Sequence, residues 1–205
     1  MIEKPLLRGH FHQAAFFVAC GACLMLISKS DSLLSLSAAS IYSLSLIFLL
    51  GTSALYHRIN WSPAARKTMK QLDHSAIYIL IAGTFTPVCL LALNEASGRT
   101  LLITIWSIAI LGVIQSLFFV HAPKWLSAIL YVVAGYMILP YVPELKDKVN
   151  LGLLIGGGLI YTLGAVTYAL KKPNFRPLVF GYHEVFHVLV IVGATFHFVL
   201  VYHLV

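Results

Sequence analysis

The sequence predicts an all-α integral membrane protein, a seven-transmembrane helix bundle with a cytoplasmic N-terminus and a C-terminus outside. Of its 205 residues, 60% are hydrophobic and only 10% are charged, which is too little polar surface for a soluble globule. The hydrophobic residues gather into seven runs, each close to the roughly 20 residues that a membrane-spanning helix needs. Lys and Arg are also divided unevenly between the two sides of these runs.

This composition argues against several other classes of protein. A soluble enzyme or a disordered chain would carry more charge, and three cysteines cannot build a disulfide scaffold. The net charge of +7 does not indicate nucleic-acid binding, because the basic residues lie in short connections beside an anionic membrane surface. We therefore expect residues 1–205 to form one domain in the cell membrane, with membrane lipid as a partner and no nucleic acid.

The seven runs lack the alternating pattern of barrel strands and are predicted to be helices. In chain order they are His10–Ile27, Leu33–His57, Asp73–Leu93, Thr100–Val120, Trp125–Tyr141, Leu151–Leu170 and His183–Val205.

Several runs have a feature that bears on their assignment. The first follows Lys4 and Arg8 and resembles a signal peptide, but a retained helix agrees better with the charge distribution. The third contains Pro87, which is expected to kink it. The fifth is short and ends in Pro140 and Pro143. The sixth is rich in glycine, which indicates close helix packing, at Gly152, Gly156, Gly157, Gly158 and Gly164.

The basic residues set the predicted orientation, because Lys and Arg favour cytoplasmic loops. With the N-terminus inside, ten of them lie inside and four lie outside. The inner ones are Lys4, Arg8, Arg58, Arg66, Lys67, Lys70, Lys124, Lys171, Lys172 and Arg176, and the outer ones are Lys29, Arg99, Lys146 and Lys148.

This orientation predicts which polar residues meet. The second run ends on the inner side with Ser53 and His57, and the third begins there with Asp73. The seventh run also begins there, with His183 and His187. We therefore expect the three segments to meet near the cytoplasmic face, where ionisable residues inside a membrane usually mark function.

The spacing of these residues suits a metal ion. His183 and His187 are four residues apart, so they share a helix face and can hold one ion together. His57 would add a third nitrogen, and three protein ligands with a water are typical of a catalytic zinc site, whereas four indicate a structural one. Histidine nitrogen without a nearby cysteine favours one Zn²⁺, with iron and nickel as alternatives.

Each residue also has a simpler explanation when it is taken alone. His57 could be an interfacial histidine at a helix end, and Asp73 a helix cap. Ser53 could satisfy a backbone carbonyl. Glu184 is explained as an acidic residue at the positive end of a helix dipole. The arrival of three histidines in one leaflet favours the metal site.

Other histidines are predicted to lie outside this site. His197 follows His187 by ten residues, about 15 Å along a helix, and is expected to be a buried, hydrogen-bonded histidine. His74 points about 100° away from Asp73. His121 belongs to the inner loop after the fourth run.

The first run contains residues with two interpretations. His10 and His12 are expected to anchor the helix at the interface, and contact with a lipid headgroup alongside Arg8 is the alternative. Cys20 and Cys23 are expected to be small packing residues rather than a redox or zinc pair.

Three motifs in the chain resemble those of the bacterial hemolysin III proteins, which belong with the progestin and adipoQ receptor family. They are Ser53-Ala-Leu-Tyr-His57-Arg, then Leu72-Asp-His-Ser-Ala-Ile77 with Ala82-Gly-Thr-Phe-Thr-Pro87, and Gly181-Tyr-His-Glu-Val-Phe-His187. The resemblance covers nearly the whole chain. It is weaker at Arg8-Gly-His-Phe-His12-Gln13, where bacterial members often show acidic and Asn residues before a His-Gly pair.

The resemblance implies a seven-helix fold with the N-terminus inside and zinc held by His57, His183 and His187. It places Asp73 near the zinc-bound water and Ser53 beside it. Adiponectin receptors and alkaline ceramidases are relatives, which points to hydrolysis of lipid amides. The bacterial branch implies a link to membrane lipid homeostasis.

Three functions are compatible with the sequence. The first is a zinc-dependent hydrolase of lipid amide or ester bonds, with Asp73 as general base and Ser53 orienting it or donating to the oxyanion. The second is a non-catalytic sensor or receptor-like protein with structural zinc. The third is a pore-forming hemolysin or transporter, for which the chain offers few intramembrane charges. The presence of the parts that a hydrolase needs favours the first.

Overall fold

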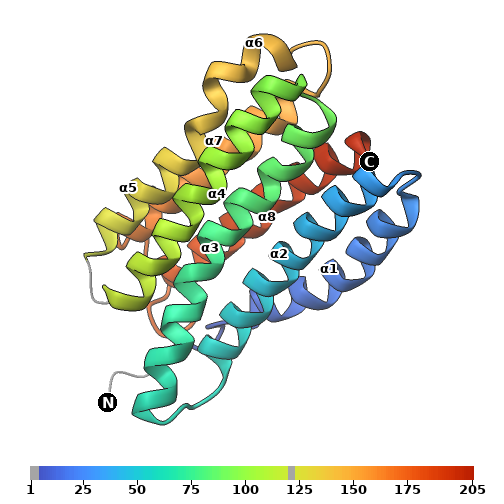
Figure 1. The fold of residues 1–205 in the computed structure, drawn as a ribbon. Coiled ribbons are helices and arrows are strands. Elements are labelled where there is room, and N and C mark those ends of the chain that lie inside the picture. The colour runs from blue at the N-terminus through green and yellow to red at the C-terminus, as the bar shows by residue number, and fades with distance from the viewer. Residues whose placement is uncertain (1–4, 120–122) are drawn as a thin grey trace.

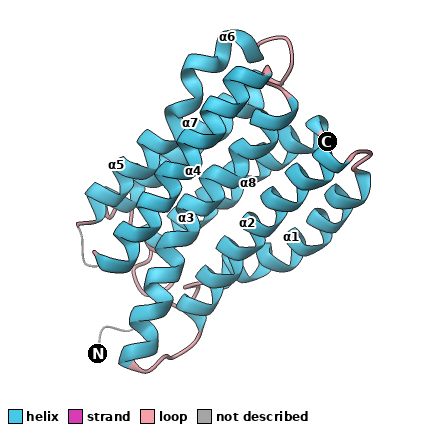
Figure 2. Cartoon of the chain, viewed as in Figure 1, coloured by secondary structure: helices cyan, strands magenta, loops and turns pink. Residues whose placement is uncertain are grey.

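The computed structural model describes residues 5–119 and 123–205 as a bundle of long helices joined by short loops (Figures 1 and 2). Within this part of the chain, seven helices are long and apolar enough to cross a membrane, the fifth spanning Trp125–Leu145. The predicted seven-helix class is confirmed. Lys4, Val120 and His121 lie outside the described residues. The elements are α1 (His10–Lys29), α2 (Leu33–Arg58), α3 (Pro63–Leu91), α4 (Glu95–Phe118), α5 (Lys124–Gly135), the 3₁₀ helix η1 (Tyr136–Tyr141), α6 (Val142–Leu145), α7 (Leu151–Leu170) and α8 (Tyr182–Leu204).

The helices pack mainly against their neighbours in the chain. α2 packs between α1 and α3, α4 packs on α3, and α7 joins α5 to α8. α8 also contacts α1 and α3, so the last helix runs through the interior of the bundle (Figure 1). Many large apolar side chains remain exposed, among them Phe17, Leu44 and Leu163. An apolar outer surface of this kind suits contact with lipid.

The third helix begins ten residues earlier than the sequence predicts, at Pro63 instead of Asp73. The Ser62 hydroxyl accepts a hydrogen bond from the backbone N–H of Ala65, and Pro63 occupies the first turn, where its missing N–H costs nothing. Asp73 therefore lies inside the helix, and its interpretation as a helix cap is wrong. The apolar pattern missed these first turns because they carry basic and polar side chains.

The fifth span continues beyond its predicted end at Tyr141. α5 ends at Gly135, and the chain goes on as η1 and then α6 to Leu145. Pro140 and Pro143 lack the N–H that α-helical hydrogen bonding needs. The α-helix therefore changes to a 3₁₀ helix at Pro140 and becomes α-helical again in the short α6, which has Pro143 in its first turn.

The glycines of α7 allow α8 to approach closely, as the sequence predicts. A Cβ at Gly157 would lie 2.5 Å from Nε2 of His197, a distance that no real contact tolerates. His197 is buried, and its Nε2 lies 3.2 Å from the carbonyl oxygen of Leu154. Because a carbonyl only accepts, Nε2 donates this bond. The prediction of a buried, hydrogen-bonded histidine is confirmed.

Candidate metal centre

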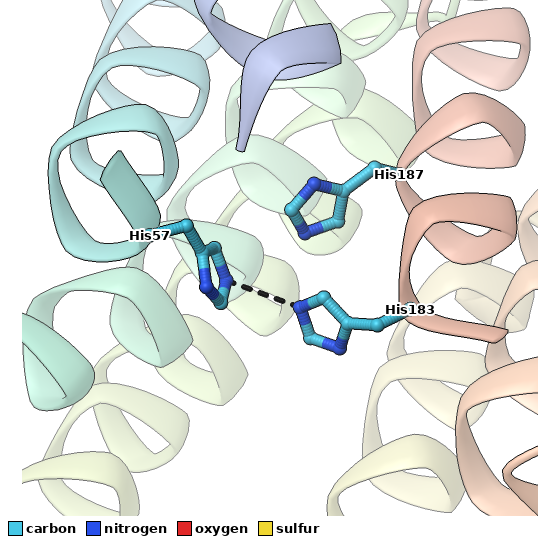
Figure 3. A group of neighbouring side chains, drawn as sticks. All are labelled: His57, His183 and His187. Atoms are coloured by element: carbon cyan, nitrogen blue, oxygen red, sulfur yellow. Dashed lines mark hydrogen bonds between the residues drawn. The ribbon is translucent and has the colours of Figure 1, made fainter. Parts of the chain in front are cut away.

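Three imidazoles from two helices converge at one end of the bundle. His57 comes from the last turn of α2, and His183 and His187 come from the first two turns of α8 (Figure 3). All three are buried, and one nitrogen from each lies within 4.8 Å of the other two. The four-residue spacing of His183 and His187 turns both rings toward His57 (Figure 3). The predicted meeting of these three residues is confirmed.

The geometry of the three nitrogens fits a small transition-metal ion. Nε2 of His57 lies 3.1 Å from Nε2 of His183. A tetrahedral zinc ion with Zn–N bonds of about 2.0–2.1 Å holds its nitrogen ligands about 3.4 Å apart. The three ring centroids are 4.6 to 5.0 Å apart, so small rotations of the rings can bring all three nitrogens onto one ion. The donor set is neutral nitrogen, which suits zinc and also iron or nickel.

The start of α8 is fixed by its own capping interaction. The backbone N–H of Gly181 donates to Oε2 of Glu184 at 2.8 Å, which closes a turn around His183. Glu184 is only 1% exposed, and its other carboxylate oxygen pairs with Nε of Arg8. The dipole interpretation of Glu184 is therefore incomplete, because this residue also joins the start of α8 to the segment before α1.

The segment before and at the start of α1 packs directly against the three histidines. The ring of His12 stacks on that of His187, with centroids 3.9 Å apart and planes 8° from parallel. Gly9 has a φ of +80°, and a Cβ there would lie 2.7 Å from Cβ of His57. His12 is 2% exposed, so its predicted role as an interfacial anchor is wrong. His12 instead packs inside the bundle against His187, and the nearby Arg8 pairs with Glu184 at the start of α8.

We expect the pair of Arg8 and Glu184 to stabilise the fold through charge. Glu184→Gln keeps an oxygen that can cap Gly181 but leaves Arg8, which is 22% exposed, without its counter-ion. The free energy of unfolding should fall by about 2 kcal/mol, because a largely buried charge is left unpaired. Thermal unfolding of the purified protein in detergent measures this loss.

Two further variants isolate the charge effect. Arg8→Gln combined with Glu184→Gln should recover most of the loss, since neither charge then remains. Arg58→Gln, which breaks an exposed contact of 3.0 Å to Gln13, should change stability by less than about 0.5 kcal/mol. Additive losses in the double variant would contradict a direct ion pair.

Asp73 and Ser53 lie beside the histidines, as the sequence predicts. Oδ2 of Asp73 is 3.9 Å from Nε2 of His57, and the Ser53 side chain hydrogen-bonds the Asp73 carboxylate. Ser53 lies one turn before His57 on α2 and is buried. The site thus combines a carboxylate, a hydroxyl and three imidazoles, drawn from α2, α3 and α8.

A cavity of about 290 Å³ leads from the histidines into the bundle. His57, Asp73, His183 and His187 line one part of it, together with basic side chains. Further in, the walls are mostly apolar, with residues such as Ile81, Phe85, Ile138, Leu154 and Val190. One continuous space therefore joins the polar site to an apolar interior.

Like His12, the remaining described histidines and cysteines are not among the residues that could hold the ion. His203 is exposed near the C-terminal end of α8, and His197 hydrogen-bonds within the bundle interior. His74 lines the cavity beside Asp73. Cys20 and Cys23 are free thiols, and Cys23 is buried among apolar side chains of α1 and α2, as expected for a packing residue.

Comparison with known proteins identifies relatives over most of the chain. Residues 1–198 match the family described as haemolysin-III related. The chain is 33% identical over 203 residues to a protein named Hemolysin-3 from Bacillus cereus, covering 96% of this chain and 90% of that protein. It is 35% identical over 159 residues to a Hemolysin-3 homolog of Bacillus subtilis (strain 168), covering 76% and 71%. It is also 30% identical over 172 residues to the Adiponectin receptor protein of Drosophila melanogaster, covering 74% of this chain and 39% of that protein.

Proposed function

The chain belongs to the haemolysin-III-related family, as a multi-pass protein of the bacterial cell membrane, and we propose that it is a zinc-dependent hydrolase of membrane lipids. The bond cleaved is the amide or ester that joins an acyl chain to the rest of the lipid. The observation that carries the proposal is the carboxylate of Asp73 beside three buried imidazoles at the end of an apolar cavity. These are the parts that hydrolysis at a metal centre requires.

His57, His183 and His187 would hold the ion. When bound, Zn²⁺ supplies a Lewis acid and makes a water molecule more acidic at neutral pH. The acyl chain would lie along the apolar part of the cavity, with its linkage at the polar end beside the histidines. The three imidazoles are buried, so they would hold the ion inside the bundle and not at its surface.

Asp73 acts as the general base in this scheme. Its carboxylate takes a proton from the attacking water, whose oxygen bonds to the carbonyl carbon of the lipid. Asp73 then passes that proton to the leaving nitrogen or oxygen as the C–N or C–O bond breaks. The products are a fatty acid and an amine or an alcohol. Ser53 orients the carboxylate through its hydrogen bond or donates to the developing oxyanion.

The proposal is tested by assaying fatty-acid release from a ceramide-like amide and from phospholipid esters by the purified protein. We expect release from at least one class, its loss after treatment with a zinc chelator, and its return when Zn²⁺ is added. Protein that holds stoichiometric metal and releases no fatty acid from either class would contradict the hydrolase.

A non-catalytic sensor or receptor with structural zinc is the second candidate. It is favoured by the similarity to a protein named as an adiponectin receptor. In that case the ion would serve to tie α2 to α8, and lipid would occupy the cavity without being cut. His57→Ala would then lower thermal stability sharply while the wild type shows no turnover.

A further inference from the structure

One face of α3 forms a continuous wall of the cavity. Arg66, Lys70, Asp73, Ile77 and Phe85 all line it, at the spacings of three, four and eight residues that share a helix face. The wall therefore changes along its length from basic, through the acid beside the histidines, to apolar.

The basic end of this wall carries an excess of positive charge. The cavity is lined by the cations Arg8, Arg66 and Lys70 and by the acid Asp73. Glu184, which does not line the cavity, pairs with Arg8, so these five groups together keep one positive charge. In a cavity with apolar walls, water screens such a charge poorly.

Arg66 is an exposed part of the cavity lining. Its guanidinium carbon lies 5.4 Å from the centroid of the Tyr56 ring, and Tyr56 also lines the cavity, one residue before His57. Arg66 is exposed, so an incoming group can reach it. A guanidinium in this position offers paired N–H donors that match a phosphate or carboxylate.

The positions along α3 match the parts of an acyl lipid. With a rise of 1.5 Å per residue, Lys70 lies about 4.5 Å and Arg66 about 10 Å before Asp73 along the helix, and Phe85 lies about 18 Å beyond it. A chain lying along Ile77 and Phe85 places its acyl linkage beside Asp73. The headgroup, a few covalent bonds away, then lies at Lys70 and Arg66.

We propose that the lipid accepted by this site carries a headgroup with a net negative charge, bound by Arg66 and Lys70. This inference rests on the proposed function for its hydrolytic consequence, although the binding step stands without turnover. It distinguishes an anionic phospholipid from neutral ceramide-like and zwitterionic lipids.

The simpler explanation of Arg66 and Lys70 is that their positive charges orient the protein in the membrane. Lys67 provides the matched control, because it is the neighbour of Arg66 on α3, is exposed, and is not among the residues that line the cavity. In the count of inner charges that sets orientation, Arg66, Lys67 and Lys70 contribute one charge each. Only Arg66 and Lys70 can affect a ligand in the cavity.

The experiment measures binding of ether-linked lipids, which cannot be hydrolysed. Native mass spectrometry of the purified, metal-loaded protein compares ether-linked phosphatidylglycerol with ether-linked phosphatidylcholine of the same chains. We expect the wild type to prefer the anionic lipid by about tenfold, the scale of one charge-assisted contact. Arg66→Gln with Lys70→Gln should bring the ratio close to one, and Lys67→Gln should leave it unchanged.

Three other results would overturn the inference. Equal binding of the two lipids by the wild type would remove the headgroup preference. A loss of preference in Lys67→Gln as large as in the double variant would assign it to general surface charge. Displacement of the lipid by inorganic phosphate at equal concentration would reduce the site to one for free anions. A preserved preference without turnover of ester-linked lipid would instead reject only the hydrolase.

Discussion

Replacement of His187 by alanine is expected to remove the bound metal from the purified protein and to lower its thermal stability. His187 is 2% exposed and is one of three nitrogen donors within 4.8 Å of one another. Two remaining histidines cannot complete a three-ligand site, so we expect the metal affinity to fall by more than about 100-fold. Elemental analysis after gel filtration measures the metal content and identifies the metal as zinc, iron or nickel.

The stability loss follows from the same contact. The ligands come from α2 and α8, which pack chiefly on other helices, so an ion binding all three joins two elements that the backbone leaves apart. An ion held at 100 times its dissociation constant contributes about 2.7 kcal/mol to the folded state. Thermal unfolding of His187→Ala should therefore show a midpoint several degrees lower, and added Zn²⁺ should not restore it.

His197→Ala provides the matched control on the same helix. His197 is also a buried histidine of α8, but it bonds to the carbonyl of Leu154 within the bundle. This variant should lose stability through its cavity and its lost hydrogen bond while keeping its metal. A wild type without stoichiometric transition metal, or a His187→Ala variant with full metal, would contradict the assignment.

Most of the candidate metal site could be predicted because its signals are local. The four-residue spacing of His183 and His187 puts both rings on one face of α8 in any helix. Successive spans cross the membrane in alternating directions. The second run therefore ends on the side of the membrane where the seventh begins. No detailed packing was needed for either step.

The contribution of α1 could not be predicted in the same way. Arg8 and Glu184 are 176 positions apart, and each has a sufficient local explanation, one as a topology signal and the other as a helix-dipole residue. The stacking of His12 on His187 depends on the angle at which α1 meets α8, which hydropathy does not specify. The available signal was that Arg8 and His12 are predicted on the same inner side as the three histidines.

The start of α3 was missed for a related physical reason. Hydropathy reports the part of a helix that lies in the apolar layer, whereas Pro63 to Leu72 extends the same helix with basic and polar side chains. This extension matters for the site, because it turns Arg66 and Lys70 from loop residues into residues of a fixed helix face. A rigid face holds charges at a set distance from Asp73, which a loop would not.

Replacement of Asp73 by asparagine is expected to abolish most of the turnover without loss of metal or fold. Asparagine has nearly the same shape and keeps an oxygen that can accept the hydrogen bond from Ser53, but it cannot take a proton from water. General-base catalysis contributes roughly 10²- to 10⁴-fold, so we expect kcat to fall by about 10³-fold. Fatty-acid release under saturating lipid measures this change.

Two serine variants test whether the loss of turnover depends on the Asp73 carboxylate and its hydrogen bond. Ser53→Ala removes one hydrogen bond to a charged group and should lower kcat by about tenfold to 100-fold. Ser75→Ala alters a buried serine of α3 two residues from Asp73 that is not among the cavity-lining residues, and it should leave kcat unchanged. Turnover that survives in Asp73→Asn would remove Asp73 from the chemistry. Because structural zinc needs no proton acceptor, a kcat that depends on Asp73 while the metal content stays constant separates a hydrolase from a receptor.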